Sequence, residues 1–157
     1  MKSAITFKKV MLMAIGLLLV SLSASAQESK IREKDVPQAV IAAFKSTYPN
    51  ATVRGYAKER EKGKLFYEIE SKDDTMRDLL YNPDGTVAEI EETVAATDLP
   101  EAAQQLIHSK YPKATVNKAE RVTAGSKVSY DVSAKQGAKR ISFVFDAEGK
   151  LEKSRVH

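Results

Sequence analysis

The sequence predicts an α+β fold: a tandem repeat of a helix plus about four antiparallel strands, with the helices packed on one face of the sheet. The first observation behind this is a phrase that occurs twice. Tyr48-Pro49-Asn50-Ala51-Thr52-Val53 recurs as Tyr111-Pro112-Lys113-Ala114-Thr115-Val116, 63 positions later (111 − 48). The second is that apolar and turn residues elsewhere keep this offset or an offset of 64. Because recurrence at a fixed period is typical of repeats, we predict two copies of one structural unit.

Each predicted unit opens with a helix. In both Asp35–Gln38 and Asp98–Glu101, an Asp precedes Gln or Glu by three residues with Pro between them, an arrangement that caps the start of a helix. Pro49 and Pro112 disfavour helical backbone at the residue before them, which predicts that both helices end there. The apolar residues at helical spacing are Val36, Val40, Ile41, Phe44 and Tyr48, then Leu99, Ala103, Leu106, Ile107 and Tyr111.

After each helix, apolar residues alternate with polar ones, which indicates strands with one buried and one solvated face. The segments Asn82–Gly85 and Asp146–Gly149 predict hairpin turns closed by a left-handed glycine. The inward face of the fourth strands stays open at this stage, and so does the continuity of the two sheets. The residues predicted to point inwards on the third strands are Leu79, Tyr81, Ile141, Phe143 and Phe145.

The first 26 residues have the pattern of a cleaved secretory signal peptide. Lysines at positions 2, 8 and 9 precede the apolar run Val10–Val20, and Ala24-Ser25-Ala26 offers a cleavage site. A membrane span needs about 20 apolar residues, so we expect no stable membrane insertion after cleavage. The predicted segments are the signal peptide 1–26, an N-terminal linker 27–35, repeat 1 at 36–97 and repeat 2 at 98–157, in a periplasmic or secreted protein.

Composition narrows the possible partners. Removing the leader leaves 22 basic residues (25 − 3) against 21 acidic ones, a balance that does not favour nucleic-acid binding. The charge is uneven, because residues 27–97 hold 11 basic and 14 acidic groups whereas residues 98–157 hold 11 and 7. The chain has no cysteine, so its fold must rest on a packed core rather than on disulfides.

Three features together resemble the PepSY-like, beta-lactamase-inhibitor-like family of exported bacterial proteins. They are the Tyr-Pro-x-Ala-Thr-Val phrase, the strands Tyr67-Glu68-Ile69-Glu70 and Tyr130-Asp131-Val132-Ser133, and the glycine hairpins, and the resemblance covers about residues 36–157. It implies helices that cover one face of a sheet, with the other face open to a protein partner. No inhibitory-loop motif matches residue by residue, so the resemblance implies no particular partner.

The sequence contains no recognisable catalytic motif, and we predict no enzyme activity, no metal and no cofactor. There is no cysteine nucleophile, and the two histidines are predicted to be an exposed helix residue, His108, and a chain terminus, His157. The adjacent acids Asp73-Asp74 and Glu91-Glu92 are predicted to be solvated charges, because neighbours along a strand point to opposite faces and the first pair lies in a polar turn.

The outward side of the strands is therefore the candidate functional surface. Apolar side chains ringed by charge are typical of recognition surfaces, although isolated exposed apolar residues are also ordinary. We predict that Phe66, Glu68, Glu70, Leu80 and Val144 contact an unidentified envelope protein or peptide, in a non-catalytic binding or inhibitory module. The alternative is a small-ligand or cation-binding envelope protein, which the acidic outward positions of repeat 1 favour.

We expect the protein to be exported and cleaved after Ala26, because the charged start, apolar run and Ala-x-Ala pattern together direct export and cleavage. Intact-mass measurement on protein recovered from the cell envelope should give a chain that begins at Gln27. A mature form that retains Met1 would contradict the prediction.

Overall fold

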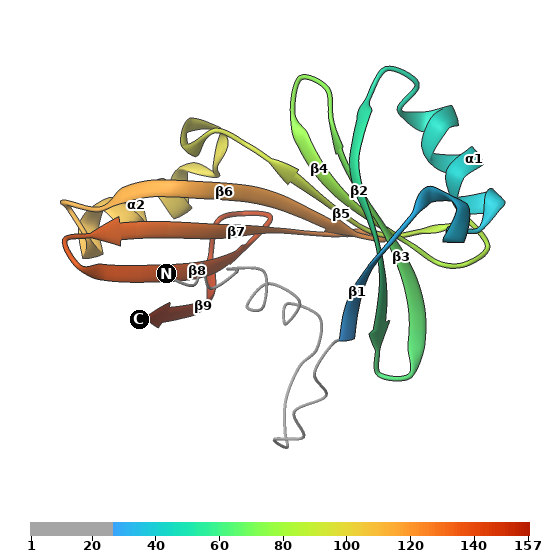
Figure 1. Ribbon diagram of the computed structural model, residues 1–157. Coiled ribbons are helices and arrows are strands. Elements are labelled where there is room, and N and C mark those ends of the chain that lie inside the picture. Colours follow the sequence, from blue (N-terminus) through green and yellow to red (C-terminus); the bar gives the residue numbers. More distant parts are fainter. Residues whose placement is uncertain (1–26) are drawn as a thin grey trace, which may run out of the picture.

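The computed structural model describes residues 27–157, which form one nine-stranded antiparallel sheet and two α-helices (Figure 1). The strands lie side by side in their chain order, so each one pairs with the next. None of the helices within this part of the chain has the length and apolarity needed to span a bilayer. The strands are β1 (Gln27–Ile31), β2 (Thr52–Glu61), β3 (Lys64–Lys72), β4 (Met76–Tyr81), β5 (Val87–Thr93), β6 (Thr115–Ala124), β7 (Lys127–Gln136), β8 (Lys139–Asp146) and β9 (Leu151–Val156). The helices are α1 (Gln38–Thr47) and α2 (Glu101–Lys110), and short 3-10 turns occupy Glu33–Asp35 and Ala96–Asp98.

The predicted fold class is wrong. The structure is mostly a single sheet of nine strands with only two helices between residues 27 and 157, instead of two units of one helix and four strands. Residues 27–31, within the segment predicted to be a linker, form β1 and pair with β2. Their polar sequence has no apolar alternation, which is why sequence reasoning missed an edge strand there. The predicted signal peptide lies outside the described residues.

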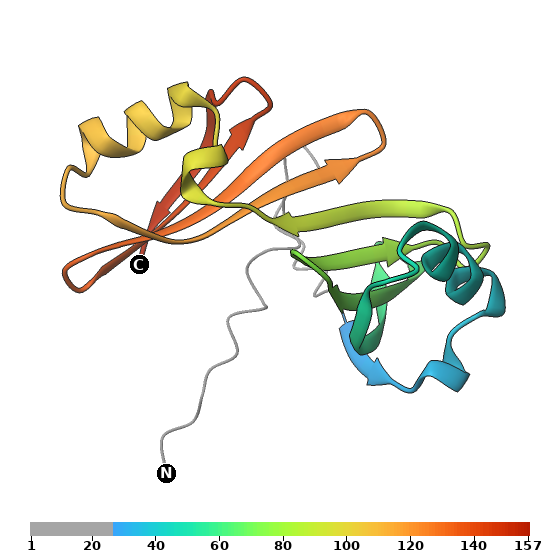
Figure 2. The same cartoon turned by 90° about the horizontal axis from the view of Figure 1, so that it is seen from above.

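Two apolar clusters form the core, and each combines residues of one helix with residues of neighbouring strands (Figures 1 and 2). Residues paired across antiparallel strands share one face of a sheet, and the register from β4 to β7 places both clusters on the same face. We call this the helix face and the opposite side the helix-free face. The cluster with α1 contains Val36, Val40, Ile41, Phe44, Ile69, Leu79 and Tyr81, and the cluster with α2 contains Leu99, Ala103, Ile107, Ala119, Val132, Ala134, Ile141, Phe143 and Phe145.

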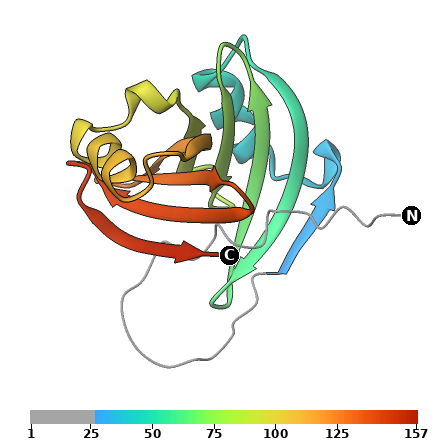
Figure 3. The same cartoon turned by 90° about the vertical axis from the view of Figure 1, so that its left-hand side faces the viewer.

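Burial confirms the inward residues predicted for the third strands. Leu79, Tyr81, Ile141, Phe143 and Phe145 are each at most 2% exposed. The sheet twists strongly along its length, and Figure 3 shows that the early strands and the last strands run in different directions. The strand direction changes at β5 and β6, which connect the part of the sheet that packs on α1 with the part that packs on α2.

The helix ends agree with the prediction, but the predicted caps do not. α1 and α2 end at Thr47 and Lys110, as the following Tyr-Pro pairs indicated. Asp35, however, accepts a hydrogen bond from the Arg32 backbone N–H at 3.4 Å, and Asp98 caps its own 3-10 turn in the same way. The extended backbone at Pro37 and Pro100 separates these turns from the α-helices, so the acids cannot reach the first helical N–H groups.

The hairpin glycines are confirmed and have a second role. Gly85 and Gly149 have positive φ angles of 87° and 82°, which glycine adopts without steric cost. A methyl group at Gly85 would lie 2.6 Å from the Ala39 carbonyl oxygen of α1, and one at Gly149 would lie 2.9 Å from the Ala103 nitrogen of α2. Each hairpin therefore packs directly against the first turn of a helix, where no side chain fits.

Gly85→Ala should destabilise the fold by about 2 kcal/mol or more, because it combines a disfavoured φ with a clash against backbone. Gly63→Ala is the matched control, since Gly63 has a φ of 82° and no atom within 4 Å of an added methyl. The control should cost only about 1 kcal/mol in urea unfolding. Equal losses in the two variants would show that helix contact does not constrain the hairpin.

Candidate binding site on the helix-free face

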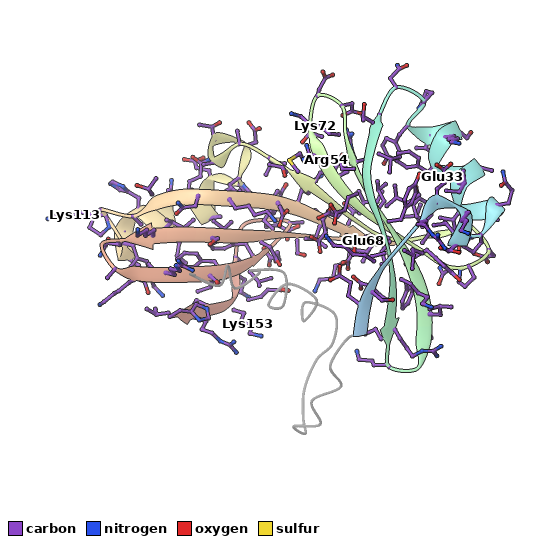
Figure 4. All side chains as sticks on the ribbon, in the orientation of Figure 1. Glu33, Arg54, Glu68, Lys72, Lys113 and Lys153 are labelled. Carbon is purple, nitrogen blue, oxygen red and sulfur yellow. The ribbon has the colours of Figure 1, made fainter. Side chains whose placement is uncertain are left out.

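The strand register places all five predicted contact residues on the helix-free face. Glu68 pairs with Leu80, Phe66 and Glu70 lie two residues either side of Glu68, and Val144 occupies the corresponding face of β8. Four of the five are half-buried, whereas Glu68 is only 8% exposed and so is buried rather than outward in solvent. In Figure 4, Glu68 lies near the middle of the sheet, away from Lys113 at its far end. The role of the five predicted contact residues in binding stays a prediction.

Sequence reasoning missed several further carboxyl groups on the same face, four of which lie on β5, β6 and β7. Glu89 pairs with Leu80 across β4 and β5, which puts it and Glu91 on the helix-free side. Glu120 of β6 pairs with Asp131 of β7 and continues the row of acids into the second half of the chain. Glu89 and Glu120 are 8% and 4% exposed. Ile90, which joins the α1 core, is the sequence signal that could have assigned its two neighbours to the opposite face.

Crowding makes these carboxyl groups unusually basic. Burial, together with the charges of Glu120, Glu89 and Asp78, raises the pKa of Glu91 to about 8. Burial, with the charge of Glu120, also raises the pKa of Asp131 to about 6. The pKa values of Glu89 and Glu120 are raised as well, mainly by burial. The five groups therefore cannot all ionise near neutral pH without a substantial electrostatic cost.

Three of the acids also lie close enough to one another to hold a single cation. One carboxylate oxygen each from Asp78, Glu91 and Glu120 lies within 4.8 Å of the others. Calcium and magnesium bind such oxygens, but acidic groups also cluster on protein surfaces without any ion. Glu120 already forms an ion pair with Lys118 at 2.5 Å. No other feature of residues 27–157 points to a bound ion, so we assign none.

The opposite face of the same strands carries an attractive ion network. Glu92 accepts a hydrogen bond from Arg77 of β4 at 2.8 Å and another from Arg121 of β6 at 2.5 Å. Arg77 also donates to Asp73 at 2.6 Å and lies over the ring of Tyr48, 5.0 Å from its centre. Burial alone would raise the pKa of Glu92, but the hydrogen bonds from Arg121 and Arg77 outweigh it and hold that pKa below its ordinary value.

The adjacent acids Glu91 and Glu92 thus point to opposite faces, as predicted, but neither is a solvated charge. Glu92 joins the ion network, and Glu91 joins the carboxyl group on the helix-free face. The prediction failed because it treated each acid with its chain neighbours alone, whereas their partners come from β4 and β6. The histidines lie apart from this site: His108 is exposed on α2, and His157 is exposed at the chain end.

The sequence places the chain in a family of beta-lactamase-inhibitor-like proteins. The family described as "Putative beta-lactamase-inhibitor-like, PepSY-like" matches residues 23–89 and again residues 78–153. The chain belongs to this family. The resemblance noted from the repeated phrase and the hairpins is therefore confirmed. No protein with a curated description matches the sequence.

Several solved structures share the fold. A DUF2874 family protein from Bacteroides uniformis has a TM-score of 0.63 at 16% identity, over 77% of this chain and 89% of its own. A BLIP-like protein from Bacteroides fragilis has a TM-score of 0.60 at 20% identity, over 77% and 86%. A protein from Bacteroides eggerthii, described as a "putative periplasmic" protein, has a TM-score of 0.62 at 14% identity, over 77% and 88%. At these identities the likeness extends to the fold alone.

Glu92→Gln should lower the free energy of unfolding by about 2 kcal/mol, because it removes the charge that Arg77 and Arg121 share at a partly buried position and leaves Arg77 with Asp73 alone. The matched control is Glu33→Gln, which breaks the exposed pair of Glu33 and Lys45 and should cost about 0.5 kcal/mol or less. Urea unfolding at neutral pH measures both. Similar losses would mean that the network contributes no more than an ordinary surface ion pair.

Proposed function

We propose that this protein is an exported, non-catalytic binding or inhibitory module whose helix-free face engages a protein or peptide that carries basic side chains. The observation that carries the proposal is the row of crowded carboxyl groups on that face, with Glu91, Glu120 and Asp131 at its centre. Half-buried apolar side chains, Phe66 and Leu80, lie on the same face.

Charge complementarity favours a basic partner. The raised pKa values of Glu91 and Asp131 mean that nearby positive charge is too weak to offset burial and like-charge repulsion. Lysine or arginine side chains from a partner would supply that charge and make hydrogen bonds to ionised carboxylates, which are stronger than neutral ones. The apolar residues beside the acids would lose their remaining contact with water in such a complex, as the core of an interface does.

The comparisons support an envelope location and a binding role. The family is described as inhibitor-like, and one structural relative is described as periplasmic. The leader predicted from the first 26 residues fits the same compartment.

Leu80→Ala and Phe66→Ala should each weaken capture of an envelope protein by the immobilised mature chain about 30-fold, because truncating a central anchor typically costs about 2 kcal/mol of binding. Both variants should keep the melting temperature within a few degrees, since the residues are only half-buried in the free protein. Val156→Ala, an apolar truncation at the 51%-exposed end of β9, is the control and should leave capture unchanged.

The charge of the partner is tested in the same assay. Capture should fall as salt rises, and a synthetic decalysine peptide should compete for the face while decaglutamate should not. Full-strength capture by both truncated variants would place the binding surface elsewhere. If calcium chloride alone raises the melting temperature strongly while no protein is captured, the alternative of a cation-binding envelope protein is favoured instead.

A further inference from the structure

The pairing of β5 with β6 has one residue pair fewer than the next shortest pairings in the sheet. Only four residue pairs join these strands, from Ile90 with Thr123 to Thr93 with Glu120. The β1–β2, β4–β5 and β8–β9 pairings each have five. The Val94 N–H extends the joint by one further hydrogen bond to the Ala119 carbonyl, at 2.9 Å. Every strand before this joint belongs to the α1 part of the sheet, and every strand after it belongs to the α2 part.

The two faces of this joint have opposite electrostatics. On the helix face, Glu92 bridges Arg77 and Arg121, so charges of opposite sign hold β4, β5 and β6 together. On the helix-free face, Asp78 and Glu120 approach Glu91 from the strands on either side of it. When ionised, these three groups repel one another across the same three strands. The joint therefore combines a permanent attraction on one side with a repulsion that depends on protonation on the other.

The neighbourhood of Glu91 is dominated by acids. Asp78 and Glu120 lie nearest, and Glu89 and Asp131 also act on its charge. The helix-free side of the sheet also carries positive charge, through Lys118 paired with Glu120 and through Lys153, which acts on Asp131. The titratable and charged groups that face this cluster are Glu59 and Glu61 from β2, Glu68 and Glu70 from β3, Asp78 from β4, Glu89 from β5, Lys118 and Glu120 from β6, Asp131 from β7, and Glu152 and Lys153 from β9.

We propose that the β5–β6 joint is a pH-sensitive coupling between the two parts of the sheet. With the carboxyl groups protonated, the joint is closed and the two parts keep one fixed orientation. With the groups ionised, mutual repulsion of Asp78, Glu91 and Glu120 loosens the helix-free side, while the Glu92 network retains the connection on the helix face. The angle between the two parts then varies, and with it the shape of the helix-free face.

The direction in which pH changes stability follows from the groups whose pKa values are shifted. The pKa of Glu91 is raised from 4.5 to about 8, so the closed joint binds its proton more tightly than the unfolded chain does. This contribution to stability is fully present below the unfolded pKa and is lost as pH rises through about 8. Asp131 adds a contribution that is lost as pH rises through about 6. Glu92 has a lowered pKa, so its network stays intact across this window and weakens only in acid.

The experiment measures the distance between the two parts directly. Because the chain has no cysteine, Ser46→Cys on α1 and His108→Cys on α2 give one exposed spin-label site on each side of the joint. Pulsed electron resonance on residues 27–157, with a chelator present, should show a narrow distance distribution near pH 5.5 and a broader one near pH 8.5. The urea midpoint should fall over the same range, with the unfolding equilibrium constant rising by at least about tenfold.

Glu91→Gln keeps the size and hydrogen-bonding groups of the side chain but cannot ionise, so it should keep the distribution narrow at both pH values. Glu148→Gln, at an exposed hairpin position, is the matched control and should behave as the unsubstituted chain does. An unsubstituted chain whose distribution does not change between the two pH values would overturn the proposal. So would a broadening that persists in both Glu91→Gln and Asp131→Asn. The test needs no partner, so its failure would leave the proposed binding function standing.

Discussion

The register between β5 and β6 is the constraint on which the rest of the structure depends. Because Ile90 pairs with Thr123 and Glu92 with Arg121, the side chains that pack on α1 and those that pack on α2 emerge on the same side of the sheet. A slip of one residue would turn one half over, place α2 on the opposite face and divide the row of acids between two surfaces. The continuous acidic face thus follows from four residue pairs.

Local patterns in the sequence predicted the helix ends, the hairpins and the inward strand residues, although the predicted Asp caps belong to 3-10 turns and not to the α-helices. The Tyr-Pro pairs end the helices, glycine closes the hairpins, and alternation identifies inward residues such as Leu79 and Phe143. The fold class failed at the two points where no local pattern exists. β1 is polar apart from Ile31 and pairs along the edge of β2. The joint between the halves depends on the register of residues 27 to 33 positions apart, from Thr93 with Glu120 (120 − 93) to Ile90 with Thr123 (123 − 90).

In the candidate site, too, local patterns predicted some features, whereas contacts between distant residues decided the others. The alternation of side chains along β3 and β4 was enough to place Phe66, Glu68 and Leu80 on one face, but exposure was predicted wrongly for Glu68, which is only 8% exposed. Glu91 looks like half of a solvated acidic pair until the strands on either side of it are known. Its neighbours Asp78 and Glu120 come from positions 13 residues before it (91 − 78) and 29 after it (120 − 91). No local reading of the sequence could bring these three together.

The arrangement also explains why a row of buried acids can persist in a fold that has no disulfide. Burying like charges together is unfavourable, and the chain offsets this on the other side of the same strands, where Glu92 holds two arginines. The attraction on the helix face therefore permits the repulsion on the helix-free face, and neither can change without affecting the other. A ligand that supplied positive charge to Glu91 and Asp131 would remove the repulsion and stabilise the joint. If the helix-free face binds such a ligand as proposed, binding and the orientation of the two halves would be linked through one set of carboxyl groups.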